Sequence, residues 1–571
     1  MTSPPTAAPA VTRQPPAVRG RHSSPALAER PALSLVAEGV TAVCAALLML
    51  VLAVTVTLDP MSRIGQVSGL AALQLRLLLL LGLVVGLCAF WMRRRPLAPV
   101  RFAAAAVSGL ASGVTAAGVS LGLRDTTWPL NAQDGDSGAL QAWAGALMDG
   151  QSLDGGYPPV YPHLIAWTAE YVTDGQVGHA LKLVGLVFVA LLGPVAYLAW
   201  RLLLPPLWAL GVGVTAALPM MQPYKPYTNI VLVAFVPVLA KLLQMVQRAP
   251  ELTRRRATTT GAVLGLAIGL MFIVYSGWFV WSAAGAVVLT AVLLFRLQRA
   301  SGTRALVTAA CTLGAAGAAF LVVAGLSLFK LLSSAGSTVD RYCYFDTYTE
   351  PAYFAMWRDD LPGSDALSTW PLPGELGGVG VFSLLLLGGL GIALTLGINR
   401  AAVLVPAACA ASALLMRYWY ASHMERDQAV MLYPRTSAQL LYCLLVLTGL
   451  ACYLVVRRRA EAVPAFVVAV PLIRRPGPRA VAVGTLCALG LLFGMAGSAT
   501  ADKYMPKQEG GGTGGLAWSA QVTADHEGHC SRYAPNGVCN PPGERPKVSP
   551  PGPDEGVLSC PAGSPYPFRR Q

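Results

Sequence analysis

The sequence predicts an all-α polytopic membrane protein, and three observations lead to that prediction. More than half of the 571 residues are hydrophobic, only 12% are charged, and the mean hydropathy is +0.55. Apolar runs of about 18 or more residues, long enough to cross a hydrocarbon core of roughly 30 Å, recur along most of the chain. Such runs must be helices, because a helix satisfies its own backbone hydrogen bonds within lipid.

In chain order, we expect a disordered cytoplasmic leader over residues 1–36, because this stretch is rich in Pro, Ala and Arg. A bundle of about 13 membrane-spanning helices should follow over residues 37–498. The spans are predicted near residues 37–57, 71–92, 101–123, 179–200, 204–221, 228–247, 259–275, 278–296, 305–329, 378–397, 401–418, 436–456 and 480–498. Polar segments should form large loops at 124–178, 330–377 and 419–435, and a Pro- and Gly-rich tail from 499 to 571.

Arginine clusters in the short loops give the orientation, since basic residues accumulate on the cytoplasmic side. They lie before the first span, between the second and third, before the seventh, before the ninth and between the last two. All five clusters share one side in this arrangement. We therefore expect a multi-pass protein of the plasma membrane with a cytoplasmic N-terminus, extracytoplasmic large loops and an extracytoplasmic tail. The formal charge of +14 is then mainly a topology signal, and nucleic acid is not an expected partner.

Cysteine usage agrees with this topology. Seven of the 11 cysteines lie in apolar spans, and four lie in the predicted outer segments: Cys343, Cys530, Cys539 and Cys560. Of the possible disulfides, Cys530 with Cys539 is the favoured pair. Metal binding by these thiols with His526 and His529 is the alternative, although the paired CxxC spacing of a zinc site is missing.

The first large loop combines acidic and aromatic residues. Asp125, Asp134 and Asp136 occur here, and Trp128, Tyr157, Tyr161 and His163 are its aromatic candidates. Carboxylates hold and deprotonate hydroxyl groups, while flat rings pack on the apolar faces of sugars. The combination favours a carbohydrate-handling surface over an ordinary loop.

The acid pair in this loop has three interpretations. Asp134 or Asp136 could act as a general base on an acceptor hydroxyl, or the two could bind a divalent cation through oxygen ligands. In the purely structural interpretation they cap a helix that starts near Ser137. The three interpretations are compatible, and the sequence requires no cofactor, although a divalent cation is possible.

Several basic side chains are predicted on the extracytoplasmic side, against the tendency of basic residues to lie on the cytoplasmic side. Arg341 could meet a lipid phosphate, although an aromatic belt explains part of its surroundings. Arg426 and Arg435 should have anionic partners, either the neighbouring carboxylates or a bound phosphate. Lys225 lies between tyrosines, where snorkelling to the interface is the simple explanation.

The outer location restricts the chemistry, because nucleotides and ATP are lacking there. The chain has no Gly-rich phosphate loop and no dinucleotide fingerprint. A substrate handled on this side must be energised by other means.

Architecture and short motifs resemble a known family. Many spans, a first large loop with an Asp pair and a C-terminal outer tail resemble polyprenyl-phosphate-sugar-dependent glycosyltransferases of the GT-C type. More specifically, the chain is similar to the galactan 5-O-arabinofuranosyltransferases of the mycobacterial and corynebacterial cell envelope. The motifs concerned are WPLNAQDGD at 128–136, EPAYFAMW at 350–357, LYPRT at 432–436, and YMP at 504–506 followed by GLAW at 515–518.

The resemblance implies a GT-C-like bundle that transfers arabinofuranose from decaprenyl-phosphate-arabinose to a galactan hydroxyl, with inversion. Asp134 or Asp136 would be the base and Asp125 a supporting acid. Arg435, Arg426, Arg341 or Lys225 would neutralise the departing lipid phosphate. The short tail departs from the family pattern, so the acceptor could be another envelope glycan and the sugar another sugar.

Two other classes of function remain open on the sequence. A lipid-sugar transporter or flippase also needs many helices, but such proteins usually show repeated halves and charges near the bilayer midplane. A structural partner of an envelope-synthesis complex is the third possibility, and its outer acids would be dispensable.

Overall fold

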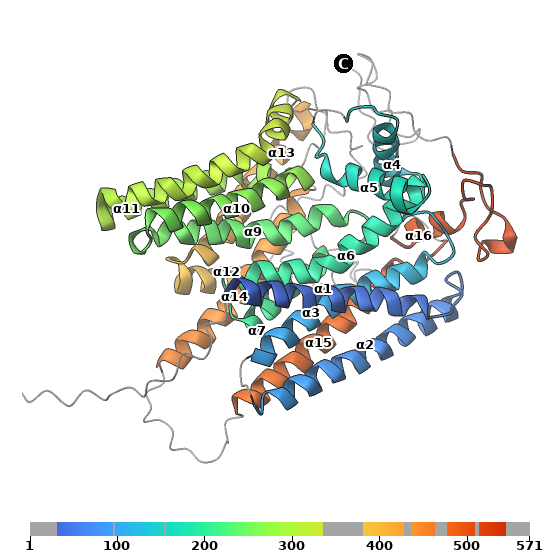
Figure 1. Ribbon diagram of the computed structural model, residues 1–571, viewed down its shortest axis with the longest axis horizontal. Helices are drawn as coiled ribbons and strands as arrows, with labels where there is room; N and C mark the ends of the chain where they lie inside the picture. Colours follow the sequence, from blue (N-terminus) through green and yellow to red (C-terminus); the bar gives the residue numbers. More distant parts are fainter. Residues whose placement is uncertain are drawn as a thin grey trace, which may run out of the picture.

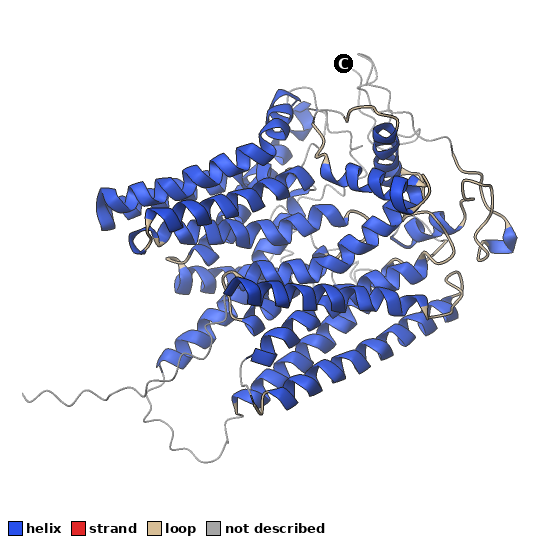
Figure 2. Cartoon of the chain, in the orientation of Figure 1, coloured by secondary structure: helices blue, strands red, loops and turns tan. Residues whose placement is uncertain are grey.

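The computed structural model describes residues 31–94, 98–153, 156–334, 381–427, 435–462, 477–508 and 513–543. Figure 2 shows helices and loops, and within these ranges there is no strand beyond an isolated bridge between Thr523 and Asn540. The first helices are α1 (Pro31–Val54), α2 (Arg63–Trp91), α3 (Ala98–Gly122), α4 (Gly135–Met148), α5 (Val160–Val172), α6 (Val177–Arg201), α7 (Pro206–Trp208), η1 (Ala209–Val214), α8 (Thr215–Ala217) and η2 (Leu218–Met220). They are followed by α9 (Pro226–Gln247), η3 (Ala249–Glu251), α10 (Arg254–Val274), α11 (Gly277–Ser334), α12 (Val381–Gly397), α13 (Ala401–Asp427), α14 (Thr436–Ala462), α15 (Pro478–Lys503), α16 (Thr513–Gln521) and η9 (Pro535–Gly537).

Ten of the described helices are long and apolar enough to cross a membrane, which confirms the all-helical, multi-pass prediction. Each of the 13 predicted spans overlaps a helix. Two of them fall on the shorter apolar helices Pro206–Met220 and Phe382–Gly397, and two fall on α11. Helix α11 changes direction at Gly302, whose φ of +73° is outside the helical region, so its two arms correspond to two predicted spans.

Helix α3 lies at the centre of one half of the bundle. It contacts α1, α2, α6 and α15 (Figure 1), and nearly all of its apolar stretch is buried. Small residues allow the close approach: a Cβ on Gly109 would lie 2.0 Å from the Ala42 carbonyl oxygen of α1, and one on Gly193 of α6 would lie 2.2 Å from the Ser108 oxygen. Packing of this kind holds helices together where lipid removes the hydrophobic driving force.

A buried carboxylate joins α1 to α6. Glu38 has no exposed surface, and its Oε2 accepts hydrogen bonds from Arg201 Nε (2.8 Å) and the Tyr197 hydroxyl (2.8 Å). The Tyr197 hydroxyl also lies 3.1 Å from the Arg101 carbonyl oxygen at the start of α3. A charge within an apolar bundle is tolerated when it is paired in this way, so the three helices are fixed together at this end.

The two ends of the bundle differ in character. One end, which we call the loop face, carries α4, α5 and α16 on the right of Figure 1. Chain direction places the basic clusters at the opposite end: residues 93–94 after α2, 254–256 before α10, 296–304 around the bend of α11, and 457–459 at the end of α14. Basic residues thus gather at one end, as the sequence predicts.

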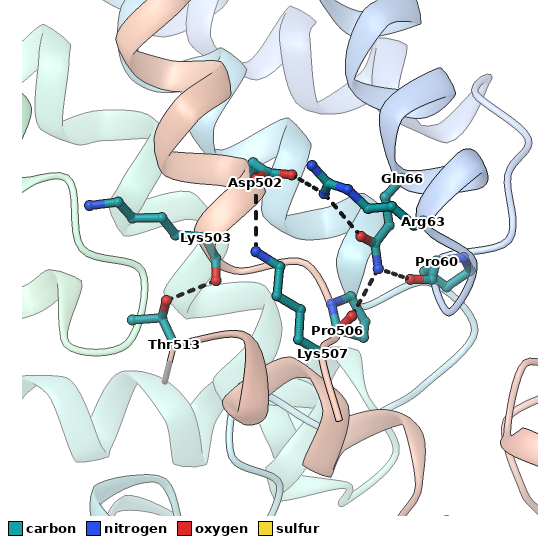
Figure 3. A network of polar contacts seen from close by, with 8 residues as sticks. All are labelled: Pro60, Arg63, Gln66, Asp502, Lys503, Pro506, Lys507 and Thr513. Atoms are coloured by element: carbon teal, nitrogen blue, oxygen red, sulfur yellow. Dashed lines mark hydrogen bonds and ion pairs between the residues drawn. The ribbon is translucent and has the colours of Figure 1, made fainter. Parts of the chain in front are cut away.

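A polar network anchors the C-terminal part of the chain at the loop face (Figure 3). Asp502, near the end of α15, forms ion pairs with Arg63 at the start of α2 and with Lys507 (3.8 Å). The buried Gln66 donates from Nε2 to the carbonyl oxygens of Pro60 and Pro506, at 2.8 Å each. These contacts hold residues 502–507, at and just after the end of α15, against the start of α2 just before the chain enters α16.

Several segments predicted as loop or tail are helical. Helix α13 continues to Asp427, into the expected loop 419–435, and α15 continues to Lys503. The expected loop 124–178 contains α4 and α5, and the expected tail contains α16. The prediction of a disordered leader over 1–36 is wrong for residues 31–36, which are the first residues of α1. Residues 1–30, the tail beyond residue 543 and most of the loop 330–377 lie outside the described residues.

Candidate functional site

The acid pair lies on a short loop between α3 and α4. We call residues 124–136 the acid loop. Helix α4 begins at Gly135, close to the predicted start near Ser137, and Asp134 occupies the N-cap position. The Asp134 side chain makes no capping hydrogen bond, and its carboxylate is exposed without an ion-pair partner among the described residues. Gly135, between the two acids, has a φ of +55°, a conformation that favours glycine and departs from the usual backbone of a helix start.

Asp136 has a cation partner from a distant part of the chain. Its carboxylate forms an ion pair with Lys225, which directly precedes α9. Neighbouring Tyr224 accepts a hydrogen bond at its hydroxyl oxygen from the Asp136 backbone N–H (3.1 Å), and the amide of Asn131 lies 3.4 Å from the same oxygen. The side chains of Lys225 and Asp136 are 30% and 46% exposed, so the pair remains open to solutes.

A group of aromatic side chains lies beside this pair. The hydroxyls of Tyr157 and Tyr227 are 2.6 Å apart, and the ring of Tyr157 lies 4.0 Å from that of Trp143 on α4. Tyr161 stacks on Tyr227 with a centroid separation of 4.2 Å. Tyr161 is almost fully buried, whereas Tyr157 is only partly buried. Of these rings, Tyr157 and Trp143 are the two that keep some exposed surface, whereas Tyr161 and Tyr227 are buried.

Charge and burial together set the state of Tyr157. Burial raises the pKa of its phenol, a hydrogen bond with Tyr227 opposes the rise, and the charge of Asp136 adds to it. The cation of Arg435, directly before α14, lowers the same pKa, so its charge reaches Tyr157. Because the pKa stays above its usual value, Tyr157 remains a protonated hydrogen-bond donor at physiological pH. Tyr157 is therefore a proton donor at this site and not a base.

Asp125 and Trp128 lie away from the Asp136–Lys225 pair, against the C-terminal segment. Asp125 Oδ2 accepts a hydrogen bond from the Arg532 backbone N–H (2.9 Å) and lies 3.5 Å from Arg532 Nε. Trp128 has no exposed surface, donates from Nε1 to the Ala524 oxygen (2.8 Å) and makes an edge contact with the ring of His526. Trp128 therefore offers no ring face to a sugar in this arrangement, and its contacts are those of a packing residue.

The remaining candidates are more scattered. His163 bonds through Nδ1 to the Pro159 oxygen of its own helix (2.7 Å), with its ring near Trp167. Arg426 lies on an exposed part of α13, and Arg341 lies outside the described residues. Cys530 and Cys539 form a disulfide, the same pair that the sequence favours.

A possible cation site lies elsewhere. Within the described residues, one group of three side chains has ligand atoms close enough to share a metal ion: Asp525, Glu527 and His529, in the loop before the disulfide. The acid pair is not part of such a group. Asp136 already has Lys225 as its cation, which competes with a metal ion at that position.

Sequence reasoning missed Tyr224, Tyr227 and Lys182. The two tyrosines flank Lys225 in the segment 222–229, and this pattern of aromatic residues around a cation indicates the site, although only Lys225 was predicted as part of it. Lys182 of α6 donates from Nζ to the carbonyl oxygens of Leu123 (2.8 Å) and Thr126 (2.6 Å), which fixes the beginning of the acid loop.

A small cavity lies behind the acid loop. Lys182, Tyr161, Tyr224 and Ser137 supply its polar wall, and the remainder is apolar. The cavity adjoins the aromatic group at Tyr161, and its apolar lining includes residues of α3 and α6.

No protein-family model matches this chain, and no curated protein shows significant similarity to it.

Proposed function

We propose that this protein is a membrane glycosyltransferase that moves a sugar from a polyprenyl-phosphate donor to the hydroxyl of a glycan. The observation that supports this most is the position of Asp134 at the loop face: its exposed carboxylate has no ion-pair partner among the described residues and lies next to the Asp136–Lys225 ion pair in the chain. The specific reaction follows from the resemblance of the motifs: arabinofuranose from decaprenyl-phosphate-arabinose to galactan, in cell-envelope synthesis.

The residues divide into a base side and a phosphate side. Asp134 takes the proton of the acceptor hydroxyl as the acceptor oxygen bonds to the anomeric carbon. The bond from that carbon to the phosphate oxygen breaks in the same displacement, with inversion, and the lipid phosphate departs. Lys225 and Arg435 neutralise the charge that develops on the phosphate. Asp136 holds Lys225 in place, and Tyr157 donates to a sugar or phosphate oxygen.

The proposed location follows from the two ends of the bundle. Basic clusters lie at the end opposite the loop face, and positive loops face the cytoplasm. The loop face is then extracytoplasmic at the plasma membrane, where a lipid-linked sugar is the available activated donor.

Single replacements of the acids test the proposal. Asp134→Asn should lower transfer from a polyprenyl-phosphate-arabinose donor to a galactan oligosaccharide by about 10²- to 10⁴-fold, because the base is lost. Asp149→Asn is the matched control, since Asp149 is an exposed carboxylate at the other end of α4. The measurement is the rate of sugar transfer by purified protein of equal amount.

Three outcomes separate the function classes. Transfer that Asp134→Asn leaves at the wild-type rate contradicts the assignment of the base. Movement of the lipid-sugar across vesicle membranes without transfer favours a flippase. A wild-type protein without either activity, with acids that are dispensable for envelope synthesis in cells, favours a structural role.

A further inference from the structure

The segment 513–543, which we call the cap, lies directly on the acid loop. Figure 1 shows α16, the first part of the cap, at the same end of the bundle as α4. Three donors of the acid loop reach cap carbonyl oxygens: Asn131 N–H to Leu516 (2.7 Å), Thr126 Oγ1 to Ala520 (2.7 Å) and Trp128 Nε1 to Ala524 (2.8 Å). The contact is built along the whole loop rather than at one point.

Gln521 is the polar centre of this contact. Its side chain is fully buried at the end of α16, and Nε2 donates to the carbonyl oxygens of Gly122 (3.0 Å) and Arg124 (2.9 Å). Its Oε1 accepts from the Ser531 hydroxyl (2.7 Å). Removal of this amide leaves two carbonyl oxygens without these bonds at the point where α3 ends and the acid loop begins.

The acid loop has a backbone conformation that needs external support. Asp125, Asn131 and Ala132 have φ values of +61°, +69° and +45°, which are uncommon for residues other than glycine. Such residues persist where the surrounding structure holds them. The support reaches the acid pair, because the Asn131 oxygen accepts a hydrogen bond from the Asp134 backbone N–H (2.9 Å).

The disulfide closes the cap around Gln521. Cys530 precedes Ser531, the donor to Gln521, and Cys539 precedes Asn540. The backbone of Asn540 exchanges hydrogen bonds with Val522 and Ala524, each 2.8 Å long, directly after Gln521. A disulfide limits the conformations open to such a short segment, so the two parts of the cap, before and after the loop that it closes, stay on the acid loop while the bond is intact.

We propose that the cap is a disulfide-dependent positioning element: Gln521 and the Cys530–Cys539 bond hold the acid loop so that Asp134 meets its substrate, and reduction of the bond releases it. The catalytic part of this inference rests on the proposed glycosyltransferase function. The structural part does not, since it concerns the order of the acid loop alone.

Hydrogen exchange and transfer kinetics on the purified full chain test the two parts separately. In Gln521→Ala, and in the double variant Cys530→Ser with Cys539→Ser, amide exchange in residues 124–136 should accelerate at least about tenfold. The kcat for transfer should fall at least about tenfold, with the KM for the lipid donor within about twofold. Gln151→Ala, at an exposed glutamine after α4, and the double variant Cys44→Ser with Cys452→Ser, at exposed free cysteines, should leave both unchanged.

Wild-type protein treated with a phosphine reductant gives a test that needs no variant. Reduction should reproduce the faster exchange and the lower kcat, and reoxidation should restore both. Exchange in 124–136 that reduction and Gln521→Ala leave unchanged overturns the positioning role, as does a rise in KM with kcat intact. If exchange is faster in the variants but the wild-type protein transfers no sugar, the cap does order the acid loop and the proposed function is overturned.

Discussion

Lys225, directly before α9, gives Asp136 a charge partner from a distant part of the chain, and Asp134 has no ion-pair partner among the described residues. The pair is accessible on both sides, so its Coulomb energy is screened by water and its value for folding is small. Under the proposed function its value for catalysis is larger, because a positioned cation beside a developing phosphate charge would lower the barrier to transfer.

We expect Lys225→Met to separate these two effects. Transfer should fall about tenfold or more, measured as kcat/KM with the lipid donor, while the free energy of unfolding changes by less than about 1 kcal/mol. Lys507→Met is the control, since Lys507 also pairs with an aspartate, Asp502, at the loop face. Equal effects of the two replacements on transfer would contradict a specific role for Lys225.

The sequence predicted residue types at this site better than their partners. Asp134 at the start of a helix follows from local pattern, because N-cap preferences involve near neighbours. The partners of Trp128 and Asp125 lie about 400 positions later in the chain, at Ala524 and Arg532. No local spacing encodes such a contact, so Trp128 was predicted as a sugar-stacking ring while the structure buries it in the cap interface.

At the scale of elements, close contacts between α1, α3 and α6 set the frame that carries the acid loop. Hydropathy predicts where these helices lie, since each needs a long apolar run. It does not predict α4, α5 and α16, which have 14, 13 and 9 residues and do not span a membrane. Their positions depend on tertiary contacts such as those of Gln521 with Gly122 and Arg124, and a short stretch of sequence cannot reveal a contact between residues so far apart in the chain.

The close approach of α1 and α3 gives a stability prediction. Gly109→Ala should lower the free energy of unfolding by about 1–3 kcal/mol, because the new methyl group would meet backbone oxygen of Ala42. Thermal unfolding of the purified protein in detergent measures this. Gly86→Ala on α2 is the control, since no atom lies within 4 Å of its added Cβ, and the higher helix propensity of Ala should leave it equal or slightly more stable. Equal melting temperatures for both variants would contradict the contact.

At the scale of the whole molecule, the fold separates two kinds of surface. Short loops with clustered arginine lie at one end, and the acid loop, the aromatic group and the cap lie at the other. The long helices between them fix this separation, because a rigid span of about 30 Å keeps the ends on opposite sides of a bilayer. The charge pattern predicted this division from the sequence alone, since it depends only on the order of spans and loops.

The direction of the chain in the membrane is the prediction on which the choice of donor depends. We expect Gln151→Cys, after α4 on the loop face, to react with a membrane-impermeant maleimide in intact cells. Ser301→Cys, at the bend of α11 between two basic residues, should react only after the membrane is permeabilised, because positive loops remain in the cytoplasm. Both positions are exposed, so accessibility within the fold is matched. The reverse labelling pattern would place the acid loop beside cytoplasmic nucleotide-sugars, and the argument for a lipid-phosphate donor would then fail.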